Sequence, residues 1–404
     1  MIISTRKQLF SYLNPEQRLL ITICSSQNTE NIEEAKQWLA KPFNWDQLIM
    51  LSERHRLLPM LYRNIKEISS SVPVEIPQIL KDKFQYQTQH VMKLASEGIR
   101  LSCKLNQEGV SNILLKGPFL SEQLYGDATL RPSRDIDILV LPENIERVDE
   151  IILSEGYRMV YPDFTLSRKQ RNYYQKNKNQ YAYRNPDNGC LVELHWRLFS
   201  QRNLFPITTE KVFAESQEQV MAGNQIRVLS TNHCLEYLCL HGSLHQWFRL
   251  LWLRDIAQML ADENLNLNEA LLQAKKNCNE RPIEQAAYLS NLFFGTNIPI
   301  NLKSKKTLNS IASHAETAII SDEGLTLSHK INRLRIPIYK MKIKPGIAYK
   351  LSCWSILQPN FNDWKLVKLP DSIFFLYFPL RPFIWFYTVY ILRNKKKKAL
   401  GIRQ

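Results

Sequence analysis

The spacing of hydrophobic residues changes twice along the chain, and the changes separate a mixed middle part from two helical parts. Up to residue 108 hydrophobic residues recur at three- and four-residue intervals, which predicts helices. These include a helix capped by Asn14, one over 45–54 and a long one over 77–107. Helical spacing returns with Thr231 or Asn232 as the expected cap, a long apolar-faced stretch to Leu260 and further helices to about residue 358.

Between the helical parts, residues 109–230 contain short hydrophobic runs of the length typical of buried strands. The runs are 111–116, 135–141, 157–160, 180–184 and 190–196. Pro118 suits the first turn of a short helix that Gly126 would close, and another helix is expected near 142–155. We therefore predict an α+β fold, in which a small mixed β-sheet core at 109–230 is flanked by helical regions at 1–108 and 231–404.

The composition is that of a globular protein. With 404 residues and 44% hydrophobic residues, the chain is long enough for two or three packed units. Its seven cysteines contain no C-x-x-C pair, which fits neither a zinc site nor a disulfide framework, and the N-terminus lacks the pattern of a secretory signal. The expected location is the cytoplasm.

The positive charge is concentrated near the C-terminus. The net charge is +15, and residues 301–404 hold 19 Lys and Arg against 5 Asp and Glu. A charge argument for nucleic-acid binding by the sheet region is therefore weak. The C-terminal third, in contrast, suits a polyanion or an anionic membrane surface.

Candidate chemistry begins with two carboxylates on one predicted strand. Side chains alternate along a strand, so Asp135 and Asp137 should project from the same face. Two adjacent carboxylates repel each other unless a cation lies between them, and Mg²⁺ binds such carboxylates together with phosphate oxygens. Glu193, inside the apolar strand 190–196, is the expected third carboxylate of a two-metal site.

The turn before the short helix could receive phosphates. Gly117 would let backbone approach a ligand, helix-start N–H groups bind anions, and Lys116 adds a positive charge. Arg131 and Arg134, just before the carboxylates, are further candidates for phosphate contacts. The alternative is a surface cluster in which the carboxylates only pair with these arginines.

Three segments around these residues resemble one family. Leu115-Lys116-Gly117, Tyr125-Gly126-Asp127 and the Arg-Pro-x-x-Asp-x-Asp-x-Leu-Val pattern at 131–140 are similar to the "uncharacterised nucleotidyltransferase" family of the polymerase-β-like superfamily. Further similar pieces extend the resemblance over roughly 40–260. The superfamily usually has Gly-Ser or Gly-Gly at the turn where this chain has Lys116-Gly117.

The resemblance implies an enzyme that moves a nucleoside monophosphate from an NTP, such as ATP, to a hydroxyl and releases pyrophosphate. Asp135, Asp137 and Glu193 would then be catalytic and bind Mg²⁺, with Mn²⁺ as an alternative. Lys116, Gly117, Arg131 and Arg134 would bind the nucleotide. The acceptor stays open among a small molecule, a peptide or protein, and RNA.

Several further residues are candidates for a substrate cleft. His195 follows Glu193 on the same strand face and could position it or assist as a base. His241 and His245 are four residues apart on one helix, a spacing that fits a metal pair, a cleft lining or helix packing. Arg249 and Asp255 extend this region, and Asp255 is expected to pair with an arginine or to orient substrate.

The C-terminal segment leaves two other functions open. Residues 373–392 are apolar apart from Arg381 and precede four lysines at 395–398. The segment could be buried in the helical region, lie at a membrane interface or span a bilayer. The alternatives to the leading function are a toxin-like nucleotidyltransferase acting on RNA, and a non-catalytic nucleotide-binding protein docked at the membrane.

Overall fold

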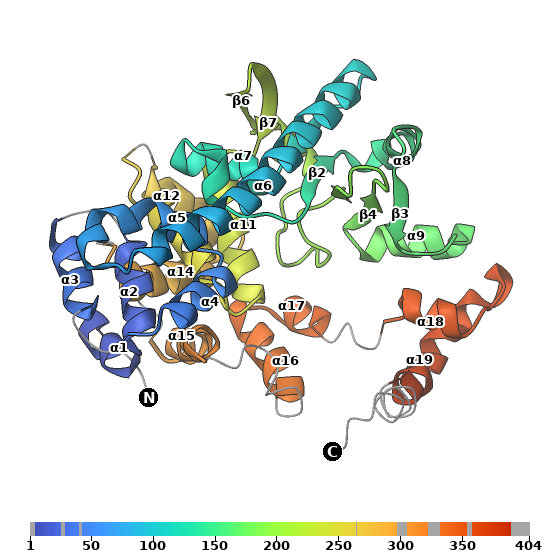
Figure 1. Ribbon diagram of the computed structural model, residues 1–404. Coiled ribbons are helices and arrows are strands. Elements are labelled where there is room, and N and C mark those ends of the chain that lie inside the picture. The colour runs from blue at the N-terminus through green and yellow to red at the C-terminus, as the bar shows by residue number, and fades with distance from the viewer. Residues whose placement is uncertain are drawn as a thin grey trace, which may run out of the picture.

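The computed structural model describes residues 5–25, 29–39, 43–263, 265–296, 305–321, 332–353 and 358–388. Helices from both ends of the chain form one group, and the β-sheet lies beside it (Figure 1). The long helix α6 (Glu75–Gln107) runs from the helical group to the sheet. The sheet and the helices that pack on it therefore present the predicted α+β arrangement.

The helical group contains elements from both flanks of the sheet region. The N-terminal helices are α1 (Arg6–Tyr12), α2 (Pro15–Ile23), α3 (Thr29–Leu39), α4 (Trp45–Arg54), α5 (Leu58–Asn64) and η1 (Ile65–Ser71). The later helices are α11 (Thr231–Leu244), α12 (Leu250–Leu260), α13 (Leu267–Lys276), α14 (Glu280–Phe294), α15 (Lys305–Ile320), α16 (Asn332–Ile343) and α17 (Ile347–Ser352). Buried side chains of α2, α4, α11, α12 and α14 belong to one hydrophobic cluster.

Five strands form a mixed sheet in the order β1-β2-β5-β4-β3. They are β1 (Asn112–Leu114), β2 (Ile136–Val140), β3 (Arg158–Tyr161), β4 (Gln180–Arg184) and β5 (Leu191–His195). Strands β2 and β5 run parallel, and the other neighbours are antiparallel. All five predicted strands are confirmed. β1 and β2 are buried throughout, whereas exposed and half-buried positions alternate in β3.

Short elements connect the strands and cover the sheet. They are α7 (Gly117–Tyr125), η2 (Ala128–Leu130), η3 (Pro142–Asn144), α8 (Ile145–Ser154), α9 (Arg168–Asn177) and α10 (Thr209–Ala214). Gly126 ends α7 in a left-handed conformation, as predicted. A second, two-stranded sheet of β6 (Gln217–Met221) and β7 (Asn224–Val228) was not predicted.

The two hydrophobic cores do not follow the order of the sequence. The first part of α6 packs in the core of the helical group, whereas its second part, from Leu94 to Leu105, packs in the core of the sheet. The division at residues 108 and 230 stays a prediction.

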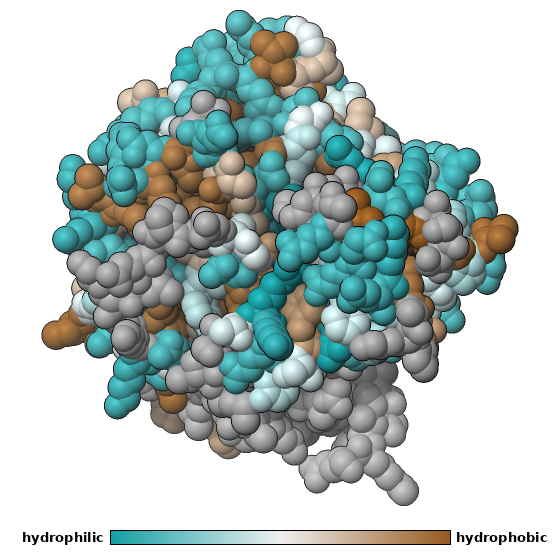
Figure 2. Space-filling model, turned by 90° about the vertical axis from the view of Figure 1, so that its left-hand side faces the viewer, coloured by the Kyte–Doolittle hydropathy of each residue, from teal (hydrophilic) through white to brown (hydrophobic). Residues whose placement is uncertain are grey.

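Figure 2 looks onto the side of the molecule at the left of Figure 1, where hydrophilic residues cover much of the surface and hydrophobic residues gather toward its upper left.

The predicted stretch from 231 to 260 is two helices rather than one. Ser230 caps α11, accepting a hydrogen bond from the N–H of His233, so the predicted caps Thr231 and Asn232 are wrong by one or two residues. The chain then breaks at Gln246 and Trp247, which have φ of 58° and 53°. Trp247 is fully buried against Gly242, where an added Cβ would come within 2.3 Å of the indole. Burial of this indole accompanies the break.

The C-terminal elements pack on the sheet side. They are α18 (Phe361–Leu366), η6 (Asp371–Leu376) and α19 (Tyr377–Phe386). Trp364 and Tyr377 join the core of the sheet, and Arg381 is buried with an ion pair to Asp363 at 2.6 Å. In the part of the chain that the structure describes, no helix is long and apolar enough to cross a membrane. Residues 389–404, with the four lysines, lie outside the described residues.

Candidate active site

Two acidic side chains face each other across the parallel strands β2 and β5. Asp137 is the register partner of Glu193, and the N–H of Leu115 donates to the carbonyl of Asp137 at 3.1 Å. Side chains at paired positions of neighbouring strands lie on the same face of a sheet. The strands therefore bring together carboxylates that lie 56 positions apart in the sequence.

Asp137 is the most tightly held of the carboxylates. Its Oδ1 lies 3.1 Å from both the Nζ of Lys116 and the Nε2 of His195. Burial alone would raise the pKa of Asp137, but Lys116 and then His195 outweigh it and hold this pKa well below its usual range. Burial likewise opposes the charge of Lys116, but the Asp137 carboxylate leaves the pKa of Lys116 raised. The pair is a buried, charged ion pair.

His195 links the two acidic strands. Its Nε2 also lies 3.6 Å from the Oε2 of Glu193, while the amide of Asn179 lies 3.3 Å from its Nδ1. If the amide nitrogen of Asn179 donates to Nδ1, the proton of a neutral ring is on Nε2 and points to Asp137. Burial lowers the pKa of His195, but hydrogen bonds to Asp137 and Glu193 outweigh it and raise this pKa.

Asp135 lies just before β2 and is half-buried. Burial, and next the neighbouring Asp137, raises the pKa of Asp135 to about 6. The hydroxyl of Ser133 donates to the carbonyl of Asp135 at 3.1 Å and fixes the backbone there. A cation between Asp135 and Asp137 would relieve the repulsion that raises this pKa.

The donor set fits a divalent cation. Asp137, Glu193 and His195 each offer one ligand atom, and these atoms lie within 4.8 Å of one another. Carboxylate oxygens suit Mg²⁺ and Mn²⁺, and the imidazole adds a ligand that suits transition metals. Of the predicted metal ligands, Asp137 and Glu193 are thus together, while Asp135 adjoins this group without being part of it.

The predicted turn at Lys116 and Gly117 has an unusual backbone conformation and brings Lys116 to the site. Gly117 begins α7 with a φ of 63°, a conformation that other residues adopt at a cost. A Cβ at this position would lie 3.1 Å from the hydroxyl oxygen of Ser133. Glycine is therefore required for both its backbone angle and its closeness to the loop before Asp135.

A cavity of about 700 Å³ opens beside these residues. The charged and histidine side chains that line it are Lys116, Lys176, Lys178, Glu193, His195, Arg202, His241, His245 and Lys340. Five of these side chains are cationic and one is acidic, so the cavity is electropositive. The predicted role of His241 and His245 as cleft-lining residues agrees with this placement.

His241 of α11 and His245, which directly follows this helix, are neutral at ordinary pH. Their ring centres lie 4.7 Å apart. Burial, and next Lys116, lowers the pKa of His241 well below its usual value, and burial, followed by Lys340, lowers that of His245 to about 4. Within the described residues they belong to no group of three potential metal ligands.

Arg131 and Asp255 lie away from the cavity and pair with each other. The Nε of Arg131 donates to Oδ2 of Asp255 at 3.0 Å, and the hydroxyl of Tyr125 donates to Oδ1 of Asp255 at 2.8 Å. Both charged side chains are almost completely buried, at 5% and 0% exposed. The expected arginine partner of Asp255 is thus Arg131, which ties the loop before Asp135 to α12.

Sequence reasoning missed Arg56. It belongs to the turn between α4 and α5, and its Nη1 donates to the carbonyl of Pro132 at 3.4 Å. Burial, and next Arg249, Arg131 and Arg134, lowers the pKa of Arg56 to about 9. Residue 56 lies in the segment 53–62, which resembles the family, but that segment does not indicate its neighbours here, because they come from distant parts of the chain.

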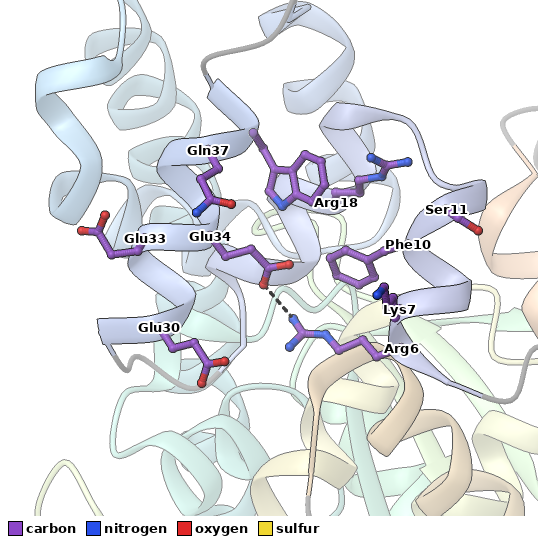
Figure 3. Close-up of a pocket in the computed structure, with 10 residues that line it drawn as sticks. Arg6, Lys7, Phe10, Ser11, Arg18, Glu30, Glu33, Glu34 and Gln37 are labelled. Carbon is purple, nitrogen blue, oxygen red and sulfur yellow. Dashed lines mark ion pairs between the residues drawn. The ribbon is translucent and has the colours of Figure 1, made fainter.

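A second hollow, also about 700 Å³, lies among α1, α2 and α3. Figure 3 shows arginines and glutamates around it, with Arg6 and Glu34 joined by an ion pair of 3.7 Å. Arg18 lies over the ring of Trp38, 4.6 Å from its centre. The acidic side chains of this hollow come from α3 and the basic ones from α1 and α2, unlike the electropositive cavity beside Glu193.

Comparisons with known proteins identify the family of the chain. The sequence model of a family described as "Uncharacterised nucleotidyltransferase" matches residues 41–295, which is well over half of the chain. A solved structure of an antigenic nucleotidyltransferase-like protein from Paracoccidioides brasiliensis is 16% identical, with 50% of this chain and 97% of that chain covered and a TM-score of 0.29. No curated protein matches the chain.

Proposed function

Because the chain belongs to the uncharacterised nucleotidyltransferase family, we propose that it transfers a nucleoside monophosphate from an NTP to a hydroxyl group. Pyrophosphate is released, and Mg²⁺ or Mn²⁺ assists. The observation that carries this proposal is the register pairing of Asp137 with Glu193, with Asp135 two residues before Asp137.

The three carboxylates hold the metal in this proposal. A bound divalent cation supplies positive charge that polarises the α-phosphate and balances the charge of the triphosphate. Asp137 of β2, Asp135 just before β2 and Glu193 of β5 would hold it. His195 keeps Asp137 and Glu193 oriented, because its Nε2 lies within 3.6 Å of both carboxylates.

Lys116 and Gly117 meet the triphosphate. Lys116 holds a positive charge 3.1 Å from Asp137, and Gly117 allows the close turn that places it there. Arg134 is exposed at the entrance to β2 and is free to contact phosphate. Arg131 was expected in the same role, but its buried pairing with Asp255 leads us to assign it the positioning of this loop instead.

The cavity beside Glu193 receives the acceptor. His241 and His245 line it as neutral side chains, and its size of about 700 Å³ admits a substrate larger than a single sugar or amino acid. An acceptor hydroxyl in this cavity would approach the carboxylates from the side of Glu193 and His195. Small molecules, peptides and RNA ends all contain such a hydroxyl.

One observation favours an RNA acceptor as the second candidate. Lys340 of α16, Ser352 of α17 and Gln358 line the same cavity, so part of the C-terminal third, with one basic side chain, reaches the site. An RNA acceptor predicts binding that weakens steeply as salt is raised. Filter binding of a short RNA between low and high salt, with Lys340→Gln beside the wild type, distinguishes this candidate from a neutral acceptor.

We also propose that residues 373–398 contact an anionic membrane surface. Phe375, Phe378 and Phe383 expose 64%, 48% and 72% of their area, and four lysines follow in the sequence. Sedimentation with phosphatidylserine vesicles should recover the protein, whereas phosphatidylcholine vesicles should recover less. A membrane-docked protein that does not catalyse would sediment without transferring any nucleotide.

The transfer assay uses each NTP labelled at the α-phosphate, with Mg²⁺ and host lysate as the source of acceptor. Asp135→Asn and Asp137→Asn should abolish metal-dependent labelling of any acceptor. Asp82→Asn is the matched control, because Asp82 is an exposed residue of α6 that bonds only to Gln78 among the contacts described. Equal labelling by the wild type and Asp137→Asn would refute the proposed function.

A further inference from the structure

Three loops that are distant in the sequence meet beside Asp135. The N–H groups of Leu250 and Leu251 donate to the Nδ1 and the carbonyl of His55 at 3.3 and 3.2 Å, which joins the start of α12 to the turn after α4. Arg56 then reaches the carbonyl of Pro132. These bonds gather Arg56, Arg134 and Arg249 around one end of the sheet.

The contacts that join these loops do not depend on charge. His55 is 2% exposed, and burial, followed by Arg54 and Arg249, lowers its pKa to about 3. Its ring is therefore neutral at ordinary pH, and Nδ1 can accept a hydrogen bond. The turn that holds Arg56 is thus fixed to α12 by a permanent contact.

The three guanidinium groups are not used in ion pairs within the part of the chain that the structure describes. Among the described residues, no carboxylate forms an ion pair with Arg56, Arg134 or Arg249, whereas Arg131 next to them is paired with Asp255. The Nε of Arg249 is buried and has no hydrogen-bond partner in the part of the chain that the structure describes. Its guanidinium lies over Phe248 and Trp252, 4.9 and 5.6 Å from the ring centres, so its position is fixed.

The arrangement of Arg56 is costly without a ligand. Its φ is 59°, in the left-handed region that non-glycine residues rarely adopt. Neighbouring arginines add to burial in lowering its pKa to about 9. Strained backbone and like charges held together by surrounding contacts are typical of binding sites.

The three arginines are not part of the cavity lining. Lys116, Glu193 and His195 line the cavity, but none of the three arginines does. The arginines instead belong to the loops that meet beside Asp135, where Arg56 bonds to Pro132 and Arg134 directly precedes Asp135. A phosphate held at the carboxylates therefore has the cavity at Glu193 and His195 and the arginine-bearing loops at Asp135.

Phosphoryl transfer places the attacking and leaving oxygens roughly in line on opposite sides of phosphorus. The acceptor oxygen forms a bond to the α-phosphorus, and the bond from that phosphorus to the bridging oxygen breaks. The bridging oxygen keeps the bonding pair and leaves as part of pyrophosphate, and the proton of the hydroxyl passes to water. The leaving group gains negative charge, so cationic side chains that are not already paired with carboxylates suit its side.

We propose that Arg56, Arg134 and Arg249 form the binding site of the departing pyrophosphate, with the acceptor entering from the cavity beside Glu193. The inference rests on the proposed nucleotidyl transfer for its place in the reaction. The pyrophosphate site is assembled from the N-terminal helices, the loop before β2 and the start of α12. The planar, forked guanidinium suits phosphate oxygens, and three of them match a ligand with several charges.

The test uses inorganic pyrophosphate and Mg²⁺ as the probe, with binding measured by isothermal titration calorimetry on the full chain. Arg56→Gln and Arg249→Gln should each weaken pyrophosphate binding at least about tenfold, the loss of one charge-assisted contact. AMP, which lacks the leaving group, should bind the variants as it binds the wild type. Arg249→Lys keeps the charge but not the fork and should fall between wild type and Arg249→Gln.

Arg147→Gln is the matched control. Arg147 is 58% exposed and bonds to Glu108 far from the site, so the same charge change there should leave pyrophosphate binding unchanged. Thermal unfolding without ligand checks that each variant folds. If Arg56→Gln does not fold, the two Arg249 variants complete the test, because that residue precedes a helix and has no carboxylate partner to lose.

The outcomes separate this inference from the proposed function. Unchanged pyrophosphate affinity in folded Arg249→Gln overturns the pyrophosphate site, even when labelled NTP is still transferred by the wild type. Equal loss of AMP and pyrophosphate binding also overturns it, because the arginines would then act on the whole nucleotide pocket. If the wild type binds pyrophosphate through these arginines but transfers no nucleotide from an NTP, the pyrophosphate site stands and the transfer reaction is refuted.

Discussion

Removing the carboxylate of Asp255 should destabilise the protein strongly. This side chain is fully buried and holds the guanidinium of Arg131 at 3.0 Å and the hydroxyl of Tyr125 at 2.8 Å. Breaking a buried pair from one side leaves an uncompensated charge and costs about 3–5 kcal/mol. We therefore expect Asp255→Ala to lower the free energy of unfolding by about that amount.

Urea denaturation followed by tryptophan fluorescence measures this change. The double variant Arg131→Met/Asp255→Leu removes both charges and should recover most of the lost stability, because apolar replacements of a buried pair are often neutral. Glu108→Ala is the control, since its pair with Lys104 lies at the surface and should contribute little to stability. A loss below about 1 kcal/mol in Asp255→Ala would refute the buried pair.

Three further predictions concern the metal and the backbone. The pKa of Asp135 is raised to about 6 by burial and by Asp137. Below that pH the folded protein therefore binds one more proton than the unfolded protein does. The stability that this proton contributes is lost as pH rises through about 6. Mg²⁺ should raise the melting temperature more above this pH than below it, and an equal shift on both sides contradicts the metal role. Gly117→Ala should cost about 1–3 kcal/mol of stability in urea denaturation, from a φ of 63° and contact with Ser133. Gly242→Ala should cost about 1–3 kcal/mol, because its Cβ would lie 2.3 Å from Trp247, and unchanged melting of either variant would contradict these contacts.

The strands could be predicted because they are short, largely apolar segments, and the acidic face because side chains alternate along a strand. Within 190–196 the apolar Val192, Leu194 and Trp196 pack in the core, and Glu193 and His195 share the other face as expected. The family resemblance then implied that Asp135, Asp137 and Glu193 share one site. The acidic face is thus encoded in short segments.

The missed elements depend on contacts between distant segments. Arg56 reaches the site because His55 bonds to α12, some 195 positions later, and no spacing near residue 56 shows this. The break before Arg249 accompanies the burial of Trp247 against Gly242, which helical periodicity does not reveal. The role of Arg131 differs from expectation because its guanidinium forms a buried ion pair with Asp255.

The two-stranded sheet had a local signal that was overlooked. Ala222 and Gly223 both have positive φ, 47° and 77°, as two-residue hairpin turns require. Small residues between short alternating segments are typical of such a turn. The neighbouring positions are largely exposed, so the hydrophobic contrast on which strand prediction depends was weak.

The most direct test of the account is the position of the metal. Crystals grown with Mn²⁺ and a non-hydrolysable NTP analogue would show the ion by anomalous diffraction. We predict a peak at coordination distance, about 2.0–2.2 Å, from carboxylate oxygens of both Asp137 and Glu193 and from a phosphate oxygen of the nucleotide. A nucleotide bound elsewhere, with no metal between β2 and β5, would contradict the account.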